Sequence, residues 1–443
     1  MENIEQGKSI EKFTKLGIKA ELADAIKEAK FTEPSEIQEK SIPKILEGKD
    51  VIGEAATGSG KTLAYSSGIV QNLERTGKTQ ALVLVPTREL AEQVCQTLVK
   101  FTKYKRLSVT PVYGGVGMGG QIDKLTFADV VVGTPGRILD HLGRGTLRLD
   151  KIKILVLDEA DRMLDMGFIR DIEKIVRMCN SERQTLLFSA TVSGEIANIA
   201  KRYMKNPETV SVKNTIDPSK LTQVYYDLPD NQKFSLLVHL LKNEKAGLVM
   251  VFCATKHMAD TVSKNLRKND IDAAAIHGGL SQYKRNSVLK DFHSGRCGVM
   301  VCTDIAARGL DIPGVSHVYN FDLPREKENY IHRIGRTARA GKDGKAISIL
   351  GSKDYENFSR IQGRLADVKL EETPEFEIVS LVKERSSDDG GFRRGGRDSR
   401  GRGFGGRGRS DDRPRRRETA DGHEDRRGFG RANSRPFQRR SRY

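Results

Sequence analysis

The stretch VIGEAATGSGKTLAY, residues 51–65, decides the fold. A short apolar run leads into a glycine-rich loop and then into a segment of helical pattern. Gly58 and Gly60 let the backbone wrap a phosphate with its N–H groups, and Lys61 reaches the terminal phosphates. Thr62 supplies a hydroxyl for a magnesium ion. A plain glycine turn is the alternative, but GKT after a buried strand is specific. The predicted nucleotide-binding residues are Ala55, Ala56, Thr57, Gly58, Ser59, Gly60, Lys61 and Thr62.

A second apolar run ends in acids, ILVLDEAD at 154–161. Asp158 is placed to hold the magnesium ion, and Glu159 to orient or deprotonate an attacking water. Capping of the next helix is the alternative reading, because acids favour a first turn. Capping explains one acid but explains three at a strand end poorly. The two stretches together predict a magnesium-dependent nucleoside triphosphatase.

Outward from these stretches, apolar runs alternate with longer mixed segments. The first set lies at 51–53, 81–85, 109–113, 130–132, 154–157 and 184–188. A polar, proline-flanked stretch at 205–220 follows, and a second set lies at 223–228, 247–253, 271–276, 298–302, 315–321 and 346–350. Runs of this kind favour parallel sheets covered on both faces. We therefore expect an α/β chain with two tandem parallel-sheet domains; one large sheet is the alternative.

The charge is concentrated at the C-terminal end. The chain has 443 residues and a formal net charge of +17, and residues 386–443 hold 18 Arg, 9 acids, 12 Gly and four Phe but no Leu, Ile, Val or Met. Such a segment buries too little apolar area to offset chain entropy, so we expect a disordered tail. Arginine pairs with phosphates and stacks on bases, which predicts RNA binding. A solvated, self-repelling linker is the alternative.

Other features bear on location. No apolar run approaches the roughly 20 residues that a bilayer crossing needs. The opening MENIEQGKSI lacks the apolar core of a signal peptide, and none of the five Cys stands in a CxxC pair. Reduced thiols and a cytoplasmic location are therefore expected, with no membrane partner.

The chain closely resembles the DEAD-box RNA helicases of superfamily 2, over about residues 13–380. The four letters are Asp158, Glu159, Ala160 and Asp161. The resemblance implies two RecA-like domains that use ATP and Mg²⁺. FTEPSEIQ at 31–38 resembles the Q motif, in which Gln38 reads the adenine edge and the upstream Phe13 stacks on the base. An amide suits that edge, since it offers a donor and an acceptor together.

Further motifs of the first domain follow expected strands. PTRELA (86–91), a glycine pair and TPGR (134–137) resemble the family's RNA-facing motifs, whose hydroxyls, backbone N–H groups and arginines suit phosphate and ribose contact. Ordinary turns with prolines are the alternative. SAT (189–191) resembles the motif that bonds to the DEAD segment and couples ATP to RNA. The residues implied are Pro86, Thr87, Arg88, Gly114, Gly115, Thr134, Pro135, Gly136 and Arg137 for RNA, and Asp161, Ser189 and Thr191 for coupling.

The second domain carries the remaining motifs. VFCAT (251–255), a QxxR element at Gln282 and Arg285, CTDIAARGLDIPGV (302–315) and HRIGRTAR (332–339) resemble the family's motifs there. The resemblance implies that Thr255 and Thr303 face RNA and that Asp311 lies near the ATP ribose. It implies that Arg336 and Arg339 are arginine fingers; a solvated basic helix is the alternative. Ala338 stands where glycine is common, which predicts a tighter turn before Arg339.

These observations predict an ATP-dependent RNA helicase that hydrolyses ATP when its domains close and separates short duplexes or remodels RNA–protein complexes. An ATP-timed RNA clamp or chaperone and a DNA-directed motor are the alternatives. The expected partner is RNA without sequence preference, and the core is expected to be monomeric. The expected segments are a helical segment with the Q motif (1–41), an ATP-binding domain (42–208), a linker (209–220), a C-terminal helicase domain (221–382) and an Arg/Gly-rich tail (383–443).

Overall fold

A computed structural model describes residues 10–56, 58–212, 220–307, 312, 314–338, 342–362 and 368–382. Three residues of the expected site, Thr57, Asp311 and Arg339, lie outside this range, as do most of the expected linker and the whole expected tail. Within the described residues, no helix is long and apolar enough to cross a membrane.

The first lobe is built on a parallel sheet of seven strands in the order β3-β4-β2-β5-β6-β1-β7. Its middle strands read as almost unbroken Val, Ile and Leu because both of their faces are covered. The strands are β1 (Val51–Glu54), β2 (Ala81–Leu84), β3 (Val109–Val112), β4 (Val130–Gly133), β5 (Ile154–Asp158), β6 (Gln184–Ser189) and β7 (Glu208–Ser211).

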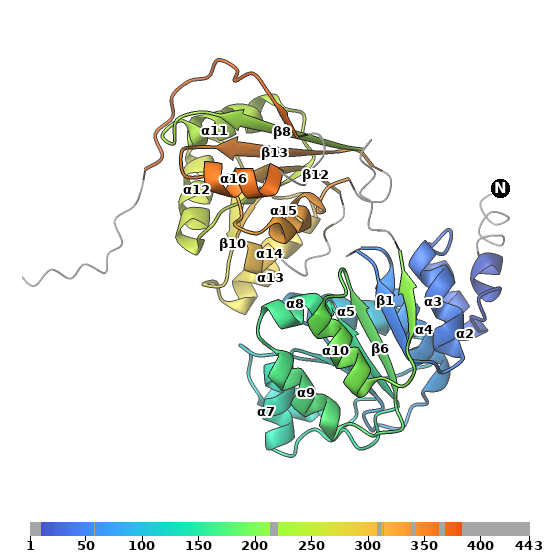
Figure 1. Cartoon of the computed structure of the whole chain (residues 1–443). Helices are drawn as coiled ribbons and strands as arrows, with labels where there is room; N and C mark the ends of the chain where they lie inside the picture. Colours follow the sequence, from blue (N-terminus) through green and yellow to red (C-terminus); the bar gives the residue numbers. More distant parts are fainter. Residues whose placement is uncertain are drawn as a thin grey trace, which may run out of the picture. The chain divides into compact units, whose positions relative to one another are not determined.

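Helices cover both faces of this sheet, as Figure 1 shows for α3 and α4 on one side and α9 and α10 on the other. Two apolar clusters fill the two interfaces, one with Leu63 and Leu98 and one with Ile172 and Ile196. The helices are α2 (Ala20–Glu28), α3 (Glu36–Leu46), α4 (Lys61–Asn72), α5 (Arg88–Phe101), α6 (Gly119–Leu125), α7 (Pro135–Gly143), α8 (Ala160–Asp165), α9 (Ile169–Met178) and α10 (Gly194–Tyr203).

The second lobe repeats the plan, with the order β10-β11-β9-β12-β13-β8-β14. Its strands are β8 (Leu221–Asp227), β9 (Leu248–Phe252), β10 (Ala273–Ile276), β11 (Val299–Cys302), β12 (Val315–Asn320), β13 (Gly344–Leu350) and β14 (Val368–Leu370). Its helices are α11 (Lys233–Asn243), α12 (Lys256–Lys268), α13 (Gln282–His293), α14 (Asp304–Ala307), α15 (Lys327–Ile334) and α16 (Tyr355–Gln362). The fold class expected from the sequence, two tandem RecA-like parallel-sheet domains, is confirmed.

Two edge strands depart from the sequence-based expectation. β7 pairs with β1, so residues 209–211, which the sequence assigned to the linker, belong to the first sheet. β14 pairs with β8 and was not expected. Both strands are short, and only Val210 of β7 is buried, so neither shows the apolar run that identifies the central strands.

After β14 the chain crosses the second lobe as an irregular segment, residues 371–382. Phe376, Val379 and Leu381 pack against the cluster beneath α11 and α12. The Ser235 hydroxyl donates to the carbonyl of Val379 at 3.2 Å, and the Asn265 amide donates to that of Val382 at 3.0 Å. Val382, the last residue that the structure describes, is therefore held against α12.

Candidate functional site

The glycine-rich loop joins β1 to α4. Gly58 and Gly60 have φ angles of 85° and 94°, a left-handed conformation that glycine adopts without steric cost. Lys61 is buried at the first turn of α4, and its Nζ donates to the carbonyl of Ala55 at 3.1 Å. The ammonium therefore lies over the loop, in the position from which it can reach bound phosphates.

Two Q-motif side chains hold this loop from the N-terminal side. Gln38 Nε2 donates to the carbonyl of Gly60 at 2.9 Å, and its Oε1 accepts from the N–H of Ser35 at 3.1 Å. The Ser35 hydroxyl donates to the carbonyl of Ser59 at 2.7 Å. A Cβ on Gly60 would meet Gln38 Nε2 at 2.2 Å, so this approach requires glycine.

The base-binding roles expected of Gln38 and Phe13 stay predictions, and the structure gives the surroundings of both side chains. Gln38 is buried, and its side-chain amide bonds to the glycine-rich loop and to the N-cap of α3. The sequence predicts that the same amide reads the adenine edge. Phe13 is fully buried in the first-lobe core, in a cluster that includes Leu22.

Asp158 ends β5 beside α4. Its carboxylate accepts from the Tyr65 hydroxyl at 3.1 Å and from the N–H of Glu159 at 3.0 Å. Burial, together with the charge of Glu159, raises the pKa of Asp158 from its usual 3.8 to about 6, although Lys61 opposes that rise. A buried carboxylate with a raised pKa is one that a bound cation would return to its charged form.

Glu159 caps α8 with a φ of 52° and is buried next to Arg162, whose Nη1 lies 2.8 Å from its carboxylate. Sequence reasoning missed Arg162 because an arginine after the acids reads as an ordinary helix residue. The spacing of three residues between Glu159 and Arg162 was the signal in the sequence, because side chains at that spacing are neighbours on a helix.

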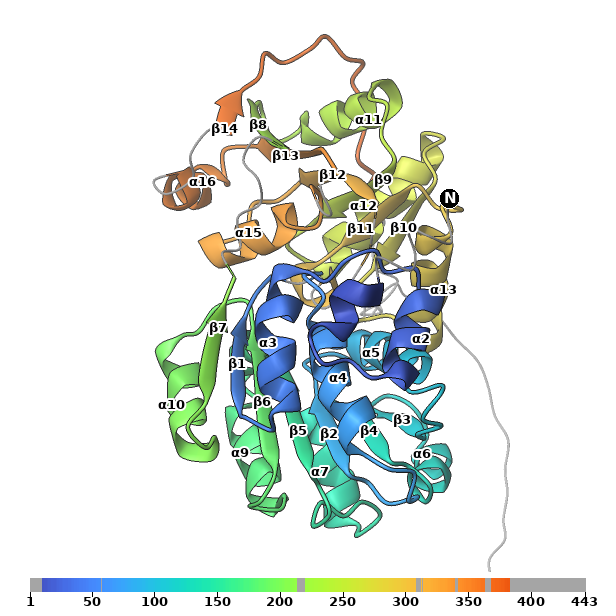
Figure 2. The same cartoon turned by 90° about the vertical axis from the view of Figure 1, so that its right-hand side faces the viewer.

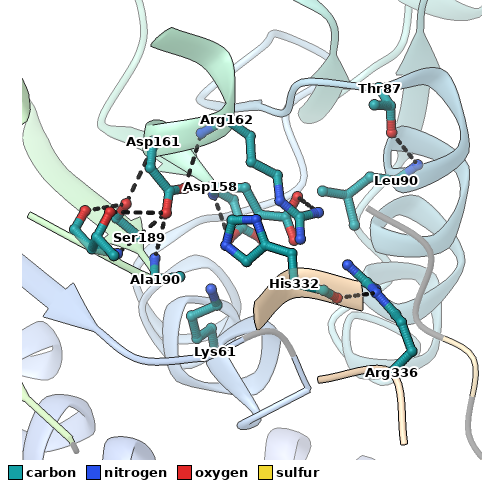
Figure 3. A network of polar contacts seen from close by, with 12 residues as sticks. Lys61, Thr87, Leu90, Asp158, Asp161, Arg162, Ser189, Ala190, His332 and Arg336 are labelled. Carbon is teal, nitrogen blue, oxygen red and sulfur yellow. Dashed lines mark hydrogen bonds and ion pairs between the residues drawn. The ribbon is translucent and has the colours of Figure 1, made fainter. Parts of the chain in front are cut away.

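Asp161 joins the acidic segment to the SAT loop (Figure 3). Its Oδ2 accepts from the N–H groups of Ala190 and Thr191 at 3.1 and 3.2 Å. Its own N–H donates to the Ser189 hydroxyl at 3.2 Å, and that hydroxyl donates to the carbonyl of Thr191 at 2.7 Å. The structure thus brings together the three residues expected to couple, over a sequence distance that no local pattern spans.

The three expected RNA-facing motifs of the first lobe lie at neighbouring strand ends. Thr87 caps α5 by accepting from the N–H of Leu90 at 3.3 Å (Figure 3). A Cβ on Gly115 would meet the Arg88 guanidinium at 1.9 Å, so Arg88 lies against the glycine-pair backbone. Arg137 donates to the carbonyl of Val116 from two nitrogens at 3.3 and 3.2 Å. The other expected residues lie in the same turns: Pro86 between β2 and α5, Gly114 between β3 and α6, and Thr134–Gly136 at the start of α7.

In the second lobe, Thr255 caps α12 by accepting from the N–H of Met258 at 3.1 Å, and the Thr303 carbonyl accepts from the N–H of Ala307 at 3.0 Å. Arg336 donates through Nε to the carbonyl of His332 at 3.2 Å (Figure 3). Ala338 has a φ of 54°, so at the position of the expected tight turn an alanine adopts the left-handed conformation.

Arg333, which the sequence did not single out, is the largest fully buried side chain among the described residues. Its guanidinium forms a two-point ion pair with Asp304 at 2.6 and 2.8 Å and lies over the ring of Phe252. This pair ties α15 to α14, and so it fixes the motif that carries Arg336 to the motif that carries Thr303.

The QxxR element contacts PTRELA. Arg285 pairs with Glu89 at 3.0 Å, and Gln282 donates to the same carboxylate at 3.0 Å. Burial lowers the pKa of Arg285, although Glu89 opposes that shift. These contacts connect α13 to α5.

Comparisons with known proteins agree with this arrangement. Residues 35–199 match the family model described as DEAD/DEAH box helicase, and residues 232–341 match the model described as Helicase conserved C-terminal domain. A protein of Geobacillus kaustophilus named DEAD-box ATP-dependent RNA helicase CshA is 47% identical over 79% of this chain and 76% of its own length. The CshA helicase of Limosilactobacillus reuteri is 44% identical over 81% and 73%.

Two solved structures are similar over most of the described residues. S. cerevisiae Dbp5 bound to RNA and ADP BeF3 is 34% identical with a TM-score of 0.74, covering 81% of this chain and 94% of its own. Mss116p bound to ssRNA and AMP-PNP is 27% identical with a TM-score of 0.73, covering 83% and 80%. The motif geometry, the two family models and these relatives together show that the chain belongs to the DEAD-box helicase family of superfamily 2.

Proposed function

We propose that this chain is an ATP-dependent RNA helicase, an ATPase that RNA stimulates and that separates short duplexes locally. The observation that carries the proposal is the contact of Asp161 with Ala190 and Thr191. One short acidic segment thereby joins Asp158 and Glu159, the residues placed to act on ATP, to a second strand-end loop. A change at the nucleotide then has a direct hydrogen-bonded route to that loop.

We propose that Thr62 and Asp158 hold Mg²⁺ with ATP. Both side chains offer hard oxygen donors, and the raised pKa of buried Asp158 is the condition that a nearby cation relieves. Among the described residues, no group of three or more His, Cys, Asp or Glu side chains could hold a metal alone. That fits an ion that takes most of its ligands from phosphate and water. When bound, the ion neutralises charge on the phosphates.

Glu159 then orients or deprotonates the attacking water, Lys61 binds the terminal phosphates, and Arg336 and Arg339 act as arginine fingers. A finger supplies about 10³–10⁵ in rate. Because the arginines and Lys61 come from different lobes, full hydrolysis requires closure. If RNA favours the same closed state, RNA and ATP must raise each other's affinity by the same factor. RNA–protein complexes are a further substrate that the same cycle can remodel.

The remaining parts of the proposal concern the surroundings of this core. The Arg/Gly-rich segment 383–443 binds RNA with little sequence preference and so holds it near the core. We propose a monomeric core in the cytoplasm, where the reduced state of the five Cys is maintained.

The test is RNA-stimulated ATP hydrolysis and duplex release by the full chain. Lys61→Ala should abolish tight ATP binding. Arg336→Ala should lower the RNA-stimulated rate by about 10³-fold or more while leaving ATP bound. The matched control is Arg202→Ala, which removes an arginine that pairs with Glu173 on the first lobe.

The outcomes separate the alternatives. Duplex release that runs equally well with a non-hydrolysable ATP analogue and with ATP would identify a clamp. Stimulation of the ATPase by DNA rather than RNA would identify a DNA motor. ATP hydrolysis at full rate without any polynucleotide, unaffected by Arg336→Ala, would contradict the closure mechanism.

A further inference from the structure

A buried polar chain lies beneath the loop 114–118 of the first lobe. It starts at Gln121 on α6, which lies beside the edge strand β3 (Figure 2), and it ends after α7. Gln121 Nε2 donates to the carbonyl of Tyr113 at 3.0 Å, and its Oε1 lies 3.1 Å from Nε2 of His141. His141 is fully buried, and its Nδ1 lies 2.8 Å from the Thr146 hydroxyl.

The donors and acceptors of this polar series can be assigned from the chemistry of its groups. A side-chain carbonyl oxygen only accepts, so the His141 ring must donate from Nε2 to Gln121. Burial, together with the charge of Arg137, lowers the pKa of His141, which favours the neutral ring. In a neutral ring Nδ1 is then an acceptor, and the single proton of the Thr146 hydroxyl faces two acceptors, Nδ1 at 2.8 Å and the His141 backbone carbonyl at 3.1 Å. Thr146, His141, Gln121 and the Tyr113 carbonyl therefore form one connected series of polar contacts.

This series meets the expected RNA-facing segments at two points. Tyr113 directly precedes the pair Gly114–Gly115, so the Gln121 bond fixes the start of that loop. Gln121 Oε1 also lies 3.5 Å from the Arg137 guanidinium, which donates to the backbone carbonyl of Val116 in the same loop.

The loop also lies against a second arginine, Arg88. Gly115 has a φ of 82°, and a Cβ there would meet the Arg88 guanidinium at 1.9 Å. The backbone of 114–116 therefore lies close to two arginines, Arg88 from PTRELA and Arg137 from TPGR. Gln121 is the side chain that contacts both the start of the loop and Arg137. Its position sets how far the loop backbone stands from that guanidinium.

We propose that Gln121 and His141 are positioning residues for RNA: they hold the loop 114–118 and Arg137 in the spacing that fits consecutive phosphates. This inference rests on the proposed function. It assigns the two side chains no contact with RNA and no part in ATP binding. A connected polar network whose central members, Gln121 and His141, are buried restricts the geometry of the groups that it joins, which is the property that a rigid binding surface needs.

Two variants test the proposal, with full-length protein and a single-stranded oligoribonucleotide in the presence of a non-hydrolysable ATP analogue. Gln121→Leu removes both hydrogen bonds, and Gln121→Glu keeps the size and the acceptor for His141 but removes the donor to Tyr113. We expect each to weaken RNA binding by about 5- to 30-fold, the effect of removing one or two hydrogen bonds. The KM for RNA should rise in the ATPase assay, while ATP-analogue binding measured without RNA should not weaken.

His141 supplies the rescue arm. His141→Leu should weaken RNA binding as Gln121→Leu does. His141→Gln keeps a donor close to the position of Nε2 and should recover most of the affinity. Failure of His141→Gln to recover affinity, in a folded protein, would show that the ring fills space and does not orient Gln121.

The matched control is Gln80→Leu. Gln80 is 3% exposed, compared with 6% for Gln121, and its Nε2 also donates to a backbone carbonyl, that of Glu74 at 2.6 Å. It precedes β2, whereas the loop 114–118 follows β3, so the two lie at opposite ends of the sheet's strands. Equal loss of RNA affinity in Gln80→Leu and Gln121→Leu would overturn the proposal, and so would wild-type RNA affinity in folded Gln121→Glu. A wild-type protein whose ATPase ignores RNA would instead contradict the proposed function.

Discussion

The carboxylate of Glu159 and the guanidinium of Arg162 form a buried ion pair at 2.8 Å, and each residue is 3% exposed. Glu159 also has a φ of 52°, a left-handed conformation that costs a non-glycine residue about 1–2 kcal/mol. A carboxylate held by a cation in a strained turn is fixed in place, which is what a group that must orient one water requires.

Glu159→Gln should retain ATP and RNA binding and lose turnover. The amide keeps an acceptor for Arg162 but cannot take a proton, so hydrolysis should fall by about 10²–10⁴-fold, the usual contribution of a general base. Single-turnover ATP hydrolysis measures the loss. Glu173→Gln is the control, because Glu173 on α9 also pairs with an arginine, Arg202 on α10, at 2.9 Å. A turnover rate in Glu159→Gln equal to that of the control would rule out a role as base.

Asp158→Asn should stabilise the protein free of ATP and magnesium at neutral pH. The pKa of buried Asp158 is raised from 3.8 to about 6, mainly by burial. The protonated form is favoured in the folded state, so this group's contribution is fully present below pH 3.8 and is lost as pH rises through about 6. The asparagine removes a penalty of about 3 kcal/mol above that range.

Urea unfolding at several pH values between 4 and 8 measures the free energy of unfolding of this variant. The gain should vanish toward pH 4, and Asp123→Asn, at an exposed position on α6, should show no such trend. A gain that does not change with pH would mean that packing, not titration of Asp158, is responsible.

Ala338→Gly should stabilise the second lobe by about 1 kcal/mol, because glycine adopts a φ of 54° without the clash that alanine suffers. Thermal unfolding followed by circular dichroism measures the shift. Ala29→Gly is the control: Ala29 ends α2 with a φ of −77°, where glycine relieves nothing and should stabilise nothing. Equal shifts in both variants would exclude strain at Ala338 as the cause.

Removal of residues 383–443 should leave the ATPase of the core largely intact and weaken RNA binding. The segment 386–443 carries 18 Arg against 9 acids, so its removal should flatten the dependence of RNA affinity on salt, by about 0.7 in log–log slope for each phosphate that the tail had neutralised. Filter binding across a salt series measures the slope. A tail of the same length with glutamine in place of arginine should behave like the deletion; if it binds RNA like the intact chain, the arginine charge is not what binds.

The sequence determined the two sheets and the order of the strand-end motifs. Runs such as 81–85 and 154–157 are apolar throughout because helices cover both faces of their sheet, and every residue of the run is therefore buried. β7 and β14 were not predicted, since edge strands carry no such apolar run. The glycine-rich loop and the acids of 158–161 were identified for the same local reason: each motif is contiguous.

Only the tertiary structure decided which side chains meet across long sequence distances. Asp161 and Thr191, Arg333 and Asp304, and Gln121 and His141 are joined by the sheet order and by helix packing, and no local pattern specifies their distances. The same packing buries Phe13 and turns Gln38 toward Gly60, because an apolar ring and an amide take whichever partners the fold places nearest. The sequence specifies the type of each residue, but the partner of that residue is a property of the folded chain.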